Sequence, residues 1–154
     1  MRKLVLFTAT AGGAGYFPVA PGTAGSLVGL GLWAVSVPLG SALSLAFLAG
    51  ITALAVWIAG RAEQLLGRED DGRIVIDEVV GMLASLALLP ARIDVAIVGF
   101  FLFRLFDIWK PPPARLAERL PGGLGVVMDD VVAGLYANLA GQLVWRVALP
   151  EGLW

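Results

Sequence analysis

Long apolar stretches are the feature that most constrains how this chain can fold. Five such stretches alternate with more polar sequence, and they cover residues 25–40, 42–60, 79–90, 94–109 and 131–149. A helix needs about 20 apolar residues to cross a hydrocarbon core of about 30 Å. The pattern predicts an all-α fold, a multihelical membrane bundle with about five apolar helices, in which residues 1–154 form a single membrane-embedded domain.

The composition agrees with this prediction and excludes several kinds of function. Hydrophobic residues make up 58% of the chain and charged residues 15%, which is typical of a membrane protein. The formal net charge of −1 leaves no cationic excess for binding nucleic acid. The chain has no cysteine and no histidine, so thiolate nucleophiles, zinc-thiolate sites and histidine-based catalysis are excluded. Any catalysis must use carboxylates, hydroxyls, lysine or arginine.

The stretches differ in length, and prolines mark where they turn. Residues 42–60 and 131–149 are long enough to span, residues 25–40 are marginal, and residues 79–90 are short enough to be re-entrant. Pro38 and Pro90 interrupt the apolar sequence, and proline ends a helix or forces a turn. We therefore expect two helical hairpins.

The basic residues predict the orientation in the membrane. Only Arg92 lies on the side opposite the two polar segments, 61–78 and 110–130. The basic residues on the side of those segments are Arg2, Lys3, Arg61, Arg68, Arg73, Lys110, Arg115 and Arg119. Because cytoplasmic loops carry the excess of Lys and Arg, the polar segments are expected to face the cytoplasm in a multi-pass protein.

Two acidic pairs stand before similar apolar sequences. Asp77-Glu78 precedes Val-Val-Gly, and Asp129-Asp130 precedes Val-Val-Ala-Gly, so each pair is expected at the entrance of a helix. Capping is one explanation, because a carboxylate near a helix N-terminus accepts hydrogen bonds from free N–H groups. The other is a functional site, because charge close to hydrocarbon is costly and usually marks a functional cavity.

A further group of charges lies near the end of the fourth stretch. Arg104, Asp107 and Lys110 are spaced three apart, which puts them close to one face of a helix. They could form a structural ion-pair ladder. Alternatively, Asp107 joins the acidic pairs while Arg104 and Lys110 face an anionic ligand such as phosphate. An oxygen-only ligand set suits a hard divalent cation such as magnesium.

The segment Ala11–Ser26 is rich in glycine and precedes an apolar stretch. A phosphate could rest on its backbone amides at the helix N-terminus. From spacing alone, an ordinary helix cap at Thr23 or Ser26 is the favoured interpretation.

Four blocks of sequence together resemble the phosphatidylglycerophosphatase A family. They are Phe17–Ser26, Ile76–Met82, Phe103–Pro111 and Met128–Gly134, in the order in which the family has them. The resemblance implies a magnesium-dependent phosphatase of the bacterial inner membrane. Its substrate would be phosphatidylglycerophosphate, and its products phosphatidylglycerol and inorganic phosphate. The active site would face the cytoplasm, in contact with membrane lipid.

The resemblance also implies which residues form the site. The family's acidic positions fall on Asp77, Glu78, Asp107, Asp129 and Asp130. We interpret all five as candidate Mg²⁺ ligands and Asp77, Asp107 and Asp130 as the catalytic carboxylates. The substrate-binding positions fall on Thr23, Ser26, Arg104 and Lys110.

Two other functions remain open at this point. Asp70-Asp71-Gly72-Arg73 faintly resembles the acidic motif of phosphatidyltransferases that use a CDP-activated lipid, but position 68 is Arg where that motif needs Asp. A small transporter or channel component is the alternative from another class, in which carboxylates pair with Arg104 inside a bundle. Charges gathered near one membrane face argue against a transport pathway.

Overall fold

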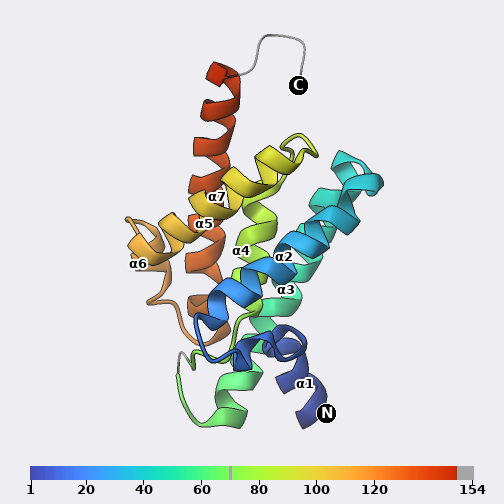
Figure 1. Ribbon diagram of the computed structural model, residues 1–154. Helices are drawn as coiled ribbons and strands as arrows, with labels where there is room; N and C mark the ends of the chain where they lie inside the picture. The colour runs from blue at the N-terminus through green and yellow to red at the C-terminus, as the bar shows by residue number, and fades with distance from the viewer. Residues whose placement is uncertain (70, 149–154) are drawn as a thin grey trace.

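The computed structural model describes residues 1–69 and 71–148, and every regular element in these ranges is helical (Figure 1). The longer helices within these ranges are α2 (Pro21–Ser36), α3 (Ser41–Leu66), α4 (Ile76–Leu86), α5 (Ile93–Trp109) and α7 (Gly123–Ala148). Shorter elements join them: α1 (Arg2–Ala9), the 3-10 helices η1 (Ala11–Tyr16) and η2 (Val37–Leu39), and α6 (Ala114–Ala117). Each apolar stretch of the sequence forms one of the longer helices, which confirms the all-α class.

Both predicted hairpin turns occur at the expected prolines. Pro38 lies in η2, and the turn into α3 ends at Gly40, whose φ of 78° glycine adopts without strain. Pro90 lies between α4 and α5, after Leu88. The prolines end the preceding helical segments because their rings cannot continue the backbone hydrogen-bond pattern.

The number of helices that can cross a membrane is smaller than the number of apolar helices. Among the described residues, three segments are long and apolar enough: Pro21–Leu39, Ser41–Leu66 and Gly123–Val147. The 11 residues of α4 rise only about 16 Å, roughly half of a hydrocarbon core. The 17 residues of α5 also fall short of the usual length. A count of five crossing helices is therefore wrong, although the apolar helices are those predicted.

Helix α4 lies at the centre of the bundle and contacts α2, α3, α5 and α7 (Figure 1). Every residue from Val79 to Leu86 is buried. The last carbonyl groups of a helix have no partner within it, and inside an apolar bundle they need one. Asn138 of α7 supplies it, because its Nδ2 donates to the carbonyl oxygens of Ala84, Ser85 and Ala87 at 2.8–3.3 Å. A helix too short to span can thus end inside the protein.

Glycines bring the neighbouring helices close to α4. A Cβ added at Gly29 of α2 would lie 2.6 Å from the carbonyl oxygen of Val79. A Cβ at Gly134 of α7 would overlap the carbonyl oxygen of Gly81. Such small-residue contacts are how helices pack closely in membranes, where the hydrophobic effect gives no preference for helix over lipid. The position of α4 therefore depends on backbone contact with α2 and α7, two of the helices long enough to cross a membrane.

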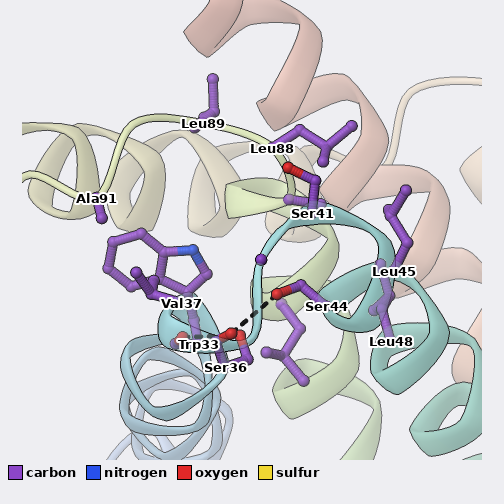
Figure 2. Close-up of a pocket in the computed structure, with 13 residues that line it drawn as sticks. Trp33, Ser36, Val37, Ser41, Ser44, Leu45, Leu48, Leu88, Leu89 and Ala91 are labelled. Atoms are coloured by element: carbon purple, nitrogen blue, oxygen red, sulfur yellow. Dashed lines mark hydrogen bonds between the residues drawn. The ribbon is translucent and has the colours of Figure 1, made fainter.

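A cavity of about 150 Å³ lies beside the C-terminal end of α4, between the two hairpin turns (Figure 2). Trp33 and Leu88 line it, and Ser44 Oγ donates to the carbonyl oxygen of Ser36 at 2.9 Å. No described residue around this cavity is charged. We interpret it as a packing feature of the turns.

We expect Gly29→Ala to destabilise the protein because the added methyl group must push α2 away from α4. Overpacking of this kind costs about 1–3 kcal/mol. Gly31→Ala is the matched control, since nothing lies within 4 Å of a Cβ at that position. Thermal unfolding in detergent micelles should show a lower Tm for Gly29→Ala and an unchanged or higher Tm for Gly31→Ala. Equal Tm values for the two variants would contradict the close contact.

Candidate active site

Acidic side chains from three helices face one cavity of about 580 Å³ at the N-terminal end of α4. We call it the carboxylate cavity. All the carboxylates predicted from the sequence line it: Asp77, Glu78, Asp107, Asp129 and Asp130. The cavity lies at the opposite end of α4 from the uncharged cavity of Figure 2.

The first turn of α4 supplies two of these carboxylates. The helix begins at Ile76, so Asp77 and Glu78 lie where negative charge complements the helix dipole. The residue before the helix, Val75, makes no side-chain capping hydrogen bond. The side chains of Asp77 and Glu78 both line the cavity, so capping alone does not account for the pair.

The second acidic pair does not stand at a helix entrance, contrary to our expectation. Helix α7 already begins at Gly123, six residues before Asp129, so Asp129 and Asp130 lie in its second turn. Gly122, with a φ of 56°, makes the turn into the helix, and a Cβ at Gly123 would overlap the carbonyl oxygen of Val56. These backbone constraints start the helix inside the segment that looked like a polar loop.

A glycine of α2 makes room for Glu78. A Cβ at Gly22 would overlap Glu78 Oε1, and it would lie 3.2 Å from Arg104 Nη1. Helix α2 begins at Pro21, after Ala20 in the left-handed conformation and without a side-chain cap. The predicted cap at Thr23 or Ser26 is therefore wrong, because proline already suits the first helical position.

The carboxylate cavity has the donor set of a cation site. Asp77, Glu78 and Asp130 each offer an oxygen, and these oxygens lie within 4.8 Å of one another. Within the described residues, Asp77 Oδ1, Glu78 Oε2, Asp129 Oδ1 and Asp130 Oδ2 are buried without a hydrogen-bond partner. Burying ionised oxygens without compensation is costly. A hard divalent cation such as Mg²⁺ matches clustered carboxylate oxygens, so the residues present fit such an ion.

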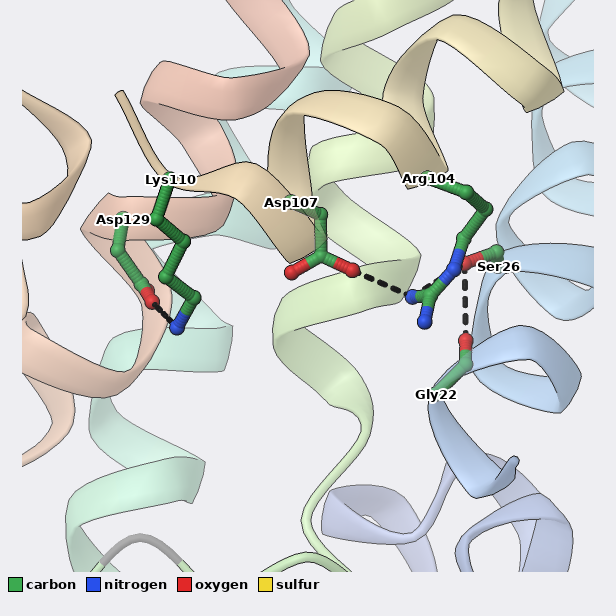
Figure 3. A network of polar contacts seen from close by, with 6 residues as sticks. All are labelled: Gly22, Ser26, Arg104, Asp107, Lys110 and Asp129. Atoms are coloured by element: carbon green, nitrogen blue, oxygen red, sulfur yellow. Dashed lines mark hydrogen bonds and ion pairs between the residues drawn. The ribbon is translucent and has the colours of Figure 1, made fainter. Parts of the chain in front are cut away.

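Two cations flank the cluster, each already paired with a carboxylate (Figure 3). Arg104 Nη1 contacts Asp107 Oδ2 at 2.5 Å and Ser26 Oγ at 3.5 Å. Lys110 Nζ contacts Asp129 Oδ2 at 2.5 Å and Glu118 Oε1 at 3.2 Å. The continuous Arg104–Asp107–Lys110 ladder does not form. Lys110 follows α5 in a left-handed conformation, and its side chain pairs with Asp129 of α7 instead of Asp107.

Its surroundings keep Lys110 charged. Burial by itself would lower the pKa of Lys110, but hydrogen bonds to Asp129 and Glu118 and the charge of Asp130 outweigh burial and raise this pKa. Lys110 thus holds a permanent positive charge against the rim of the carboxylate cavity.

The N-terminal residues expected to bind substrate lie in different places. Ser26 is buried, donates to the carbonyl oxygen of Gly22 at 2.8 Å and contacts Arg104, so it supports the arginine (Figure 3). Pro21 and Gly22 line the carboxylate cavity, whereas Thr23 does not. None of residues 11–20, the glycine-rich segment before Pro21, lines the carboxylate cavity. Within this segment, Gly15 packs against the backbone of Arg73.

Further charged residues line the cavity that the sequence patterns did not single out for the site. They are Glu63, Glu69, Glu118 and Arg119. Their sequence context is that of ordinary polar residues between apolar stretches. Only the approach of α6 and the end of α3 to α7 brings them to the cavity.

The segment that resembled a phosphatidyltransferase motif has a structural role. Asp70 lies outside the described residues. Asp71 accepts hydrogen bonds from Arg73 at 2.7–3.0 Å, through the guanidinium and the backbone N–H, and it does not line the carboxylate cavity. The adjoining Val75 N–H donates to the carbonyl oxygen of Ala9 at 2.9 Å. The pair thus orders the loop that leads into α4.

Comparison with known proteins identifies the family. The model of the family described as Phosphatidylglycerophosphatase A matches residues 7–145. The chain belongs to the phosphatidylglycerophosphatase A family. The match includes every residue of the carboxylate cavity, as well as Arg104 and Lys110.

Three relatives align with this chain over most of their own length. The Phosphatidylglycerophosphatase A of Escherichia coli is 38% identical, over 80% of this chain and 73% of the relative. The Phosphatidylglycerophosphatase A of Haemophilus influenzae is 40% identical, over 81% of this chain and 78% of the relative. A Bacteroides thetaiotaomicron protein, provisionally named a phosphatidylinositol-3-phosphatase, is 38% identical over 87% and 89%. No solved structure matches the chain.

We expect the Asp71–Arg73 pair to stabilise the protein in a pH-dependent way. The hydrogen bond from the Arg73 side chain lowers the pKa of Asp71 from 3.8 to about 2. A carboxyl group with a lowered pKa in the folded state stabilises that state above its unfolded pKa, and this contribution is lost as the pH falls through the folded pKa. Asp71→Asn should therefore lower Tm at neutral pH.

The difference in Tm between the wild type and Asp71→Asn should shrink between about pH 4 and pH 2. Circular dichroism in detergent micelles measures it. Arg73→Gln should remove the same pH-dependent component, because it deletes the partner. A difference that stays constant down to about pH 2 would contradict the role of the pair.

Proposed function

We propose that this chain hydrolyses the phosphomonoester of phosphatidylglycerophosphate, giving phosphatidylglycerol and inorganic phosphate, with Mg²⁺ as the cofactor. The observation that carries the proposal is the set of partnerless buried carboxylate oxygens at one end of an apolar bundle. Membership of the phosphatidylglycerophosphatase A family supports the substrate. The proposed metal ligands are Asp77, Glu78, Asp129 and Asp130, with Asp107 beside them.

A bound divalent cation would supply Lewis-acid stabilisation of the charge that develops on the phosphate oxygens. The residues of the chain would do the rest. Lys110 lines the cavity, and Arg104 is paired with Asp107 of its wall. Their ammonium and guanidinium groups can contact phosphate oxygens. The backbone N–H of Gly22, in the first turn of α2, offers a further donor for an anion, whereas those of Thr23 and Ala24 already donate to the carbonyl oxygen of Ala20.

Asp107 is the proposed acceptor of the proton from the attacking water. Its Oδ2 accepts a hydrogen bond from Arg104, and the side chain lines the cavity. Oδ1 is then the oxygen available to take the proton. We favour direct attack by water over a covalent aspartyl-phosphate, because the chain has no Asp-x-Asp pair. Failure to trap a phosphoenzyme during a single turnover would support that choice, and a trapped aspartyl-phosphate would contradict it.

The apolar helices suit a lipid substrate. The cavity combines the carboxylates with Leu120, Pro121 and Val126 on its wall, and the crossing helices end near it. A phosphorylated headgroup can therefore meet the carboxylates while its acyl chains stay in the bilayer. We propose that the site faces the cytoplasm of a bacterial inner membrane, as the basic residues indicate.

Purified protein should release inorganic phosphate from phosphatidylglycerophosphate in the presence of Mg²⁺ and lose this activity with a chelator. Asp77→Asn, Asp107→Asn and Asp130→Asn should each lower kcat by at least about a hundredfold, as expected for groups that act on the transition state. Asp94→Asn is the control, because Asp94 pairs with Arg92 at the opposite end of α5.

The assay also tests the rival assignments. A folded Asp130→Asn variant with wild-type turnover would contradict the proposed site. Preferential hydrolysis of phosphatidylinositol 3-phosphate would transfer the assignment to the substrate named for the Bacteroides relative. Phosphatidyl transfer that depends on a CDP-lipid, or ion flux in proteoliposomes without phosphate release, would replace it by another class of function.

The orientation can be tested by cysteine labelling, because the chain has no cysteine of its own. We expect Arg115→Cys, beside the carboxylate cavity, to react with a membrane-impermeant maleimide only after the inner membrane is opened. Ser41→Cys, at the turn between the two segments Pro21–Leu39 and Ser41–Leu66, should react in intact spheroplasts, since Arg115 and Ser41 are both exposed. The reverse labelling pattern would place the site on the outer face.

A further inference from the structure

Helix α1 lies beside the C-terminal part of α3 (Figure 1). A second basic feature lies between these two helices, outside the carboxylate cavity. It is a groove of about 260 Å³, and Arg2, Val5, Trp57, Arg61 and Gln64 line it. We call it the α1–α3 groove. Trp57, Arg61 and Gln64 recur at helical spacing and therefore form one wall, on one face of α3.

Basic and acidic side chains near the end of α3 line different cavities. Arg2 and Arg61 line the α1–α3 groove, whereas Glu63 lines the carboxylate cavity. Among the described residues around the groove none is acidic. Arg61 contacts Gln64 Oε1 at 3.4 Å, and neither arginine is ion-paired to a described carboxylate. The groove thus carries positive charge that no part of the described chain neutralises.

The depth of the groove in the membrane points to a lipid. Residues 42–60 of α3 contain no charged side chain, and Arg61 is the first charge at the end of that stretch. Trp57 lies one turn earlier, and half of its side chain is exposed. Tryptophan and then arginine at the end of an apolar span are typical of the headgroup level of a bilayer.

Helix α1 adds apolar surface beside the two arginines. Val5 and Ala9 pack against α3, whereas Leu4 and Phe7 are 68% and 61% exposed. A short helix with basic residues at its start and exposed apolar side chains is suited to the membrane interface. Acyl chains can therefore lie against α1 while a headgroup occupies the groove.

We propose that the α1–α3 groove binds the phosphodiester headgroup of an anionic membrane phospholipid, with Arg2 and Arg61 contacting the phosphate. Guanidinium groups bind phosphate through paired, charge-assisted hydrogen bonds, and the groove offers two of them without a competing carboxylate. This site is separate from the carboxylate cavity, and it does not depend on the proposed hydrolysis.

The test uses the full chain in a neutral detergent, titrated with dihexanoyl phosphatidylglycerol or dihexanoyl phosphatidylcholine. Tm should rise more with the anionic lipid. In the double variant Arg2→Gln/Arg61→Gln the apparent Kd for phosphatidylglycerol should increase about tenfold, to the value for phosphatidylcholine. Arg146→Gln is the matched control, because it removes an exposed arginine from the last turn of α7.

Further arms separate the groove from other anion sites. Asp130→Asn should keep the preference for phosphatidylglycerol, because the carboxylate cavity is not involved. Inorganic phosphate should change the Tm of the wild type and of the double variant equally. A rise in Tm with phosphate that only the wild type shows would assign the groove to a free anion. Equal effects of the two lipids on the wild type, or an unchanged preference in the double variant, would overturn the proposal.

Discussion

Buried carboxylates that lack partners are the constraint on which the rest of this structure depends. Asp77, Glu78 and Asp130 lie within reach of one another, and no described cation pairs with them. In an apolar bundle, ionised carboxylates that lie this close together are costly unless positive charge compensates them. Arg104 and Lys110 pair with the neighbouring Asp107 and Asp129, and we propose that an external cation compensates the centre of the cluster.

The short length of α4 is related to the same constraint. A helix that crosses the membrane would carry its first turn to the membrane surface. The 11-residue α4 instead holds Asp77 and Glu78 at the end of a buried helix. Asn138 satisfies the carbonyl groups at its other end. Close glycine contacts with α2 and α7 then set the distance between the acidic pairs. The chemistry and the packing are therefore parts of one arrangement.

Much of this arrangement could be predicted from the sequence. Apolar stretches identify the helices, because a helix that contacts lipid or other helices must present apolar residues on most of its surface. Prolines identify the turns. The acidic pairs and Asp107 stand out because charges are rare in such sequence, and all of these residues line one cavity. The start of α7 was misplaced, because glycines at 122, 123 and 125 resemble a loop when their helix contacts are not known.

By itself, the sequence determined the all-α class, the family and the identity of the clustered carboxylates, since local composition and spacing carry that information. Only the tertiary structure decided which charges pair. Lys110 bonds to Asp129 and Glu118 instead of Asp107, because the chain turns at the end of α5 and carries the lysine to α7. It also decided that, within residues 1–69 and 71–148, three segments are long enough to cross a membrane and that most of α4 is buried. Partners distant in sequence set these outcomes, and spacing along the chain does not encode them.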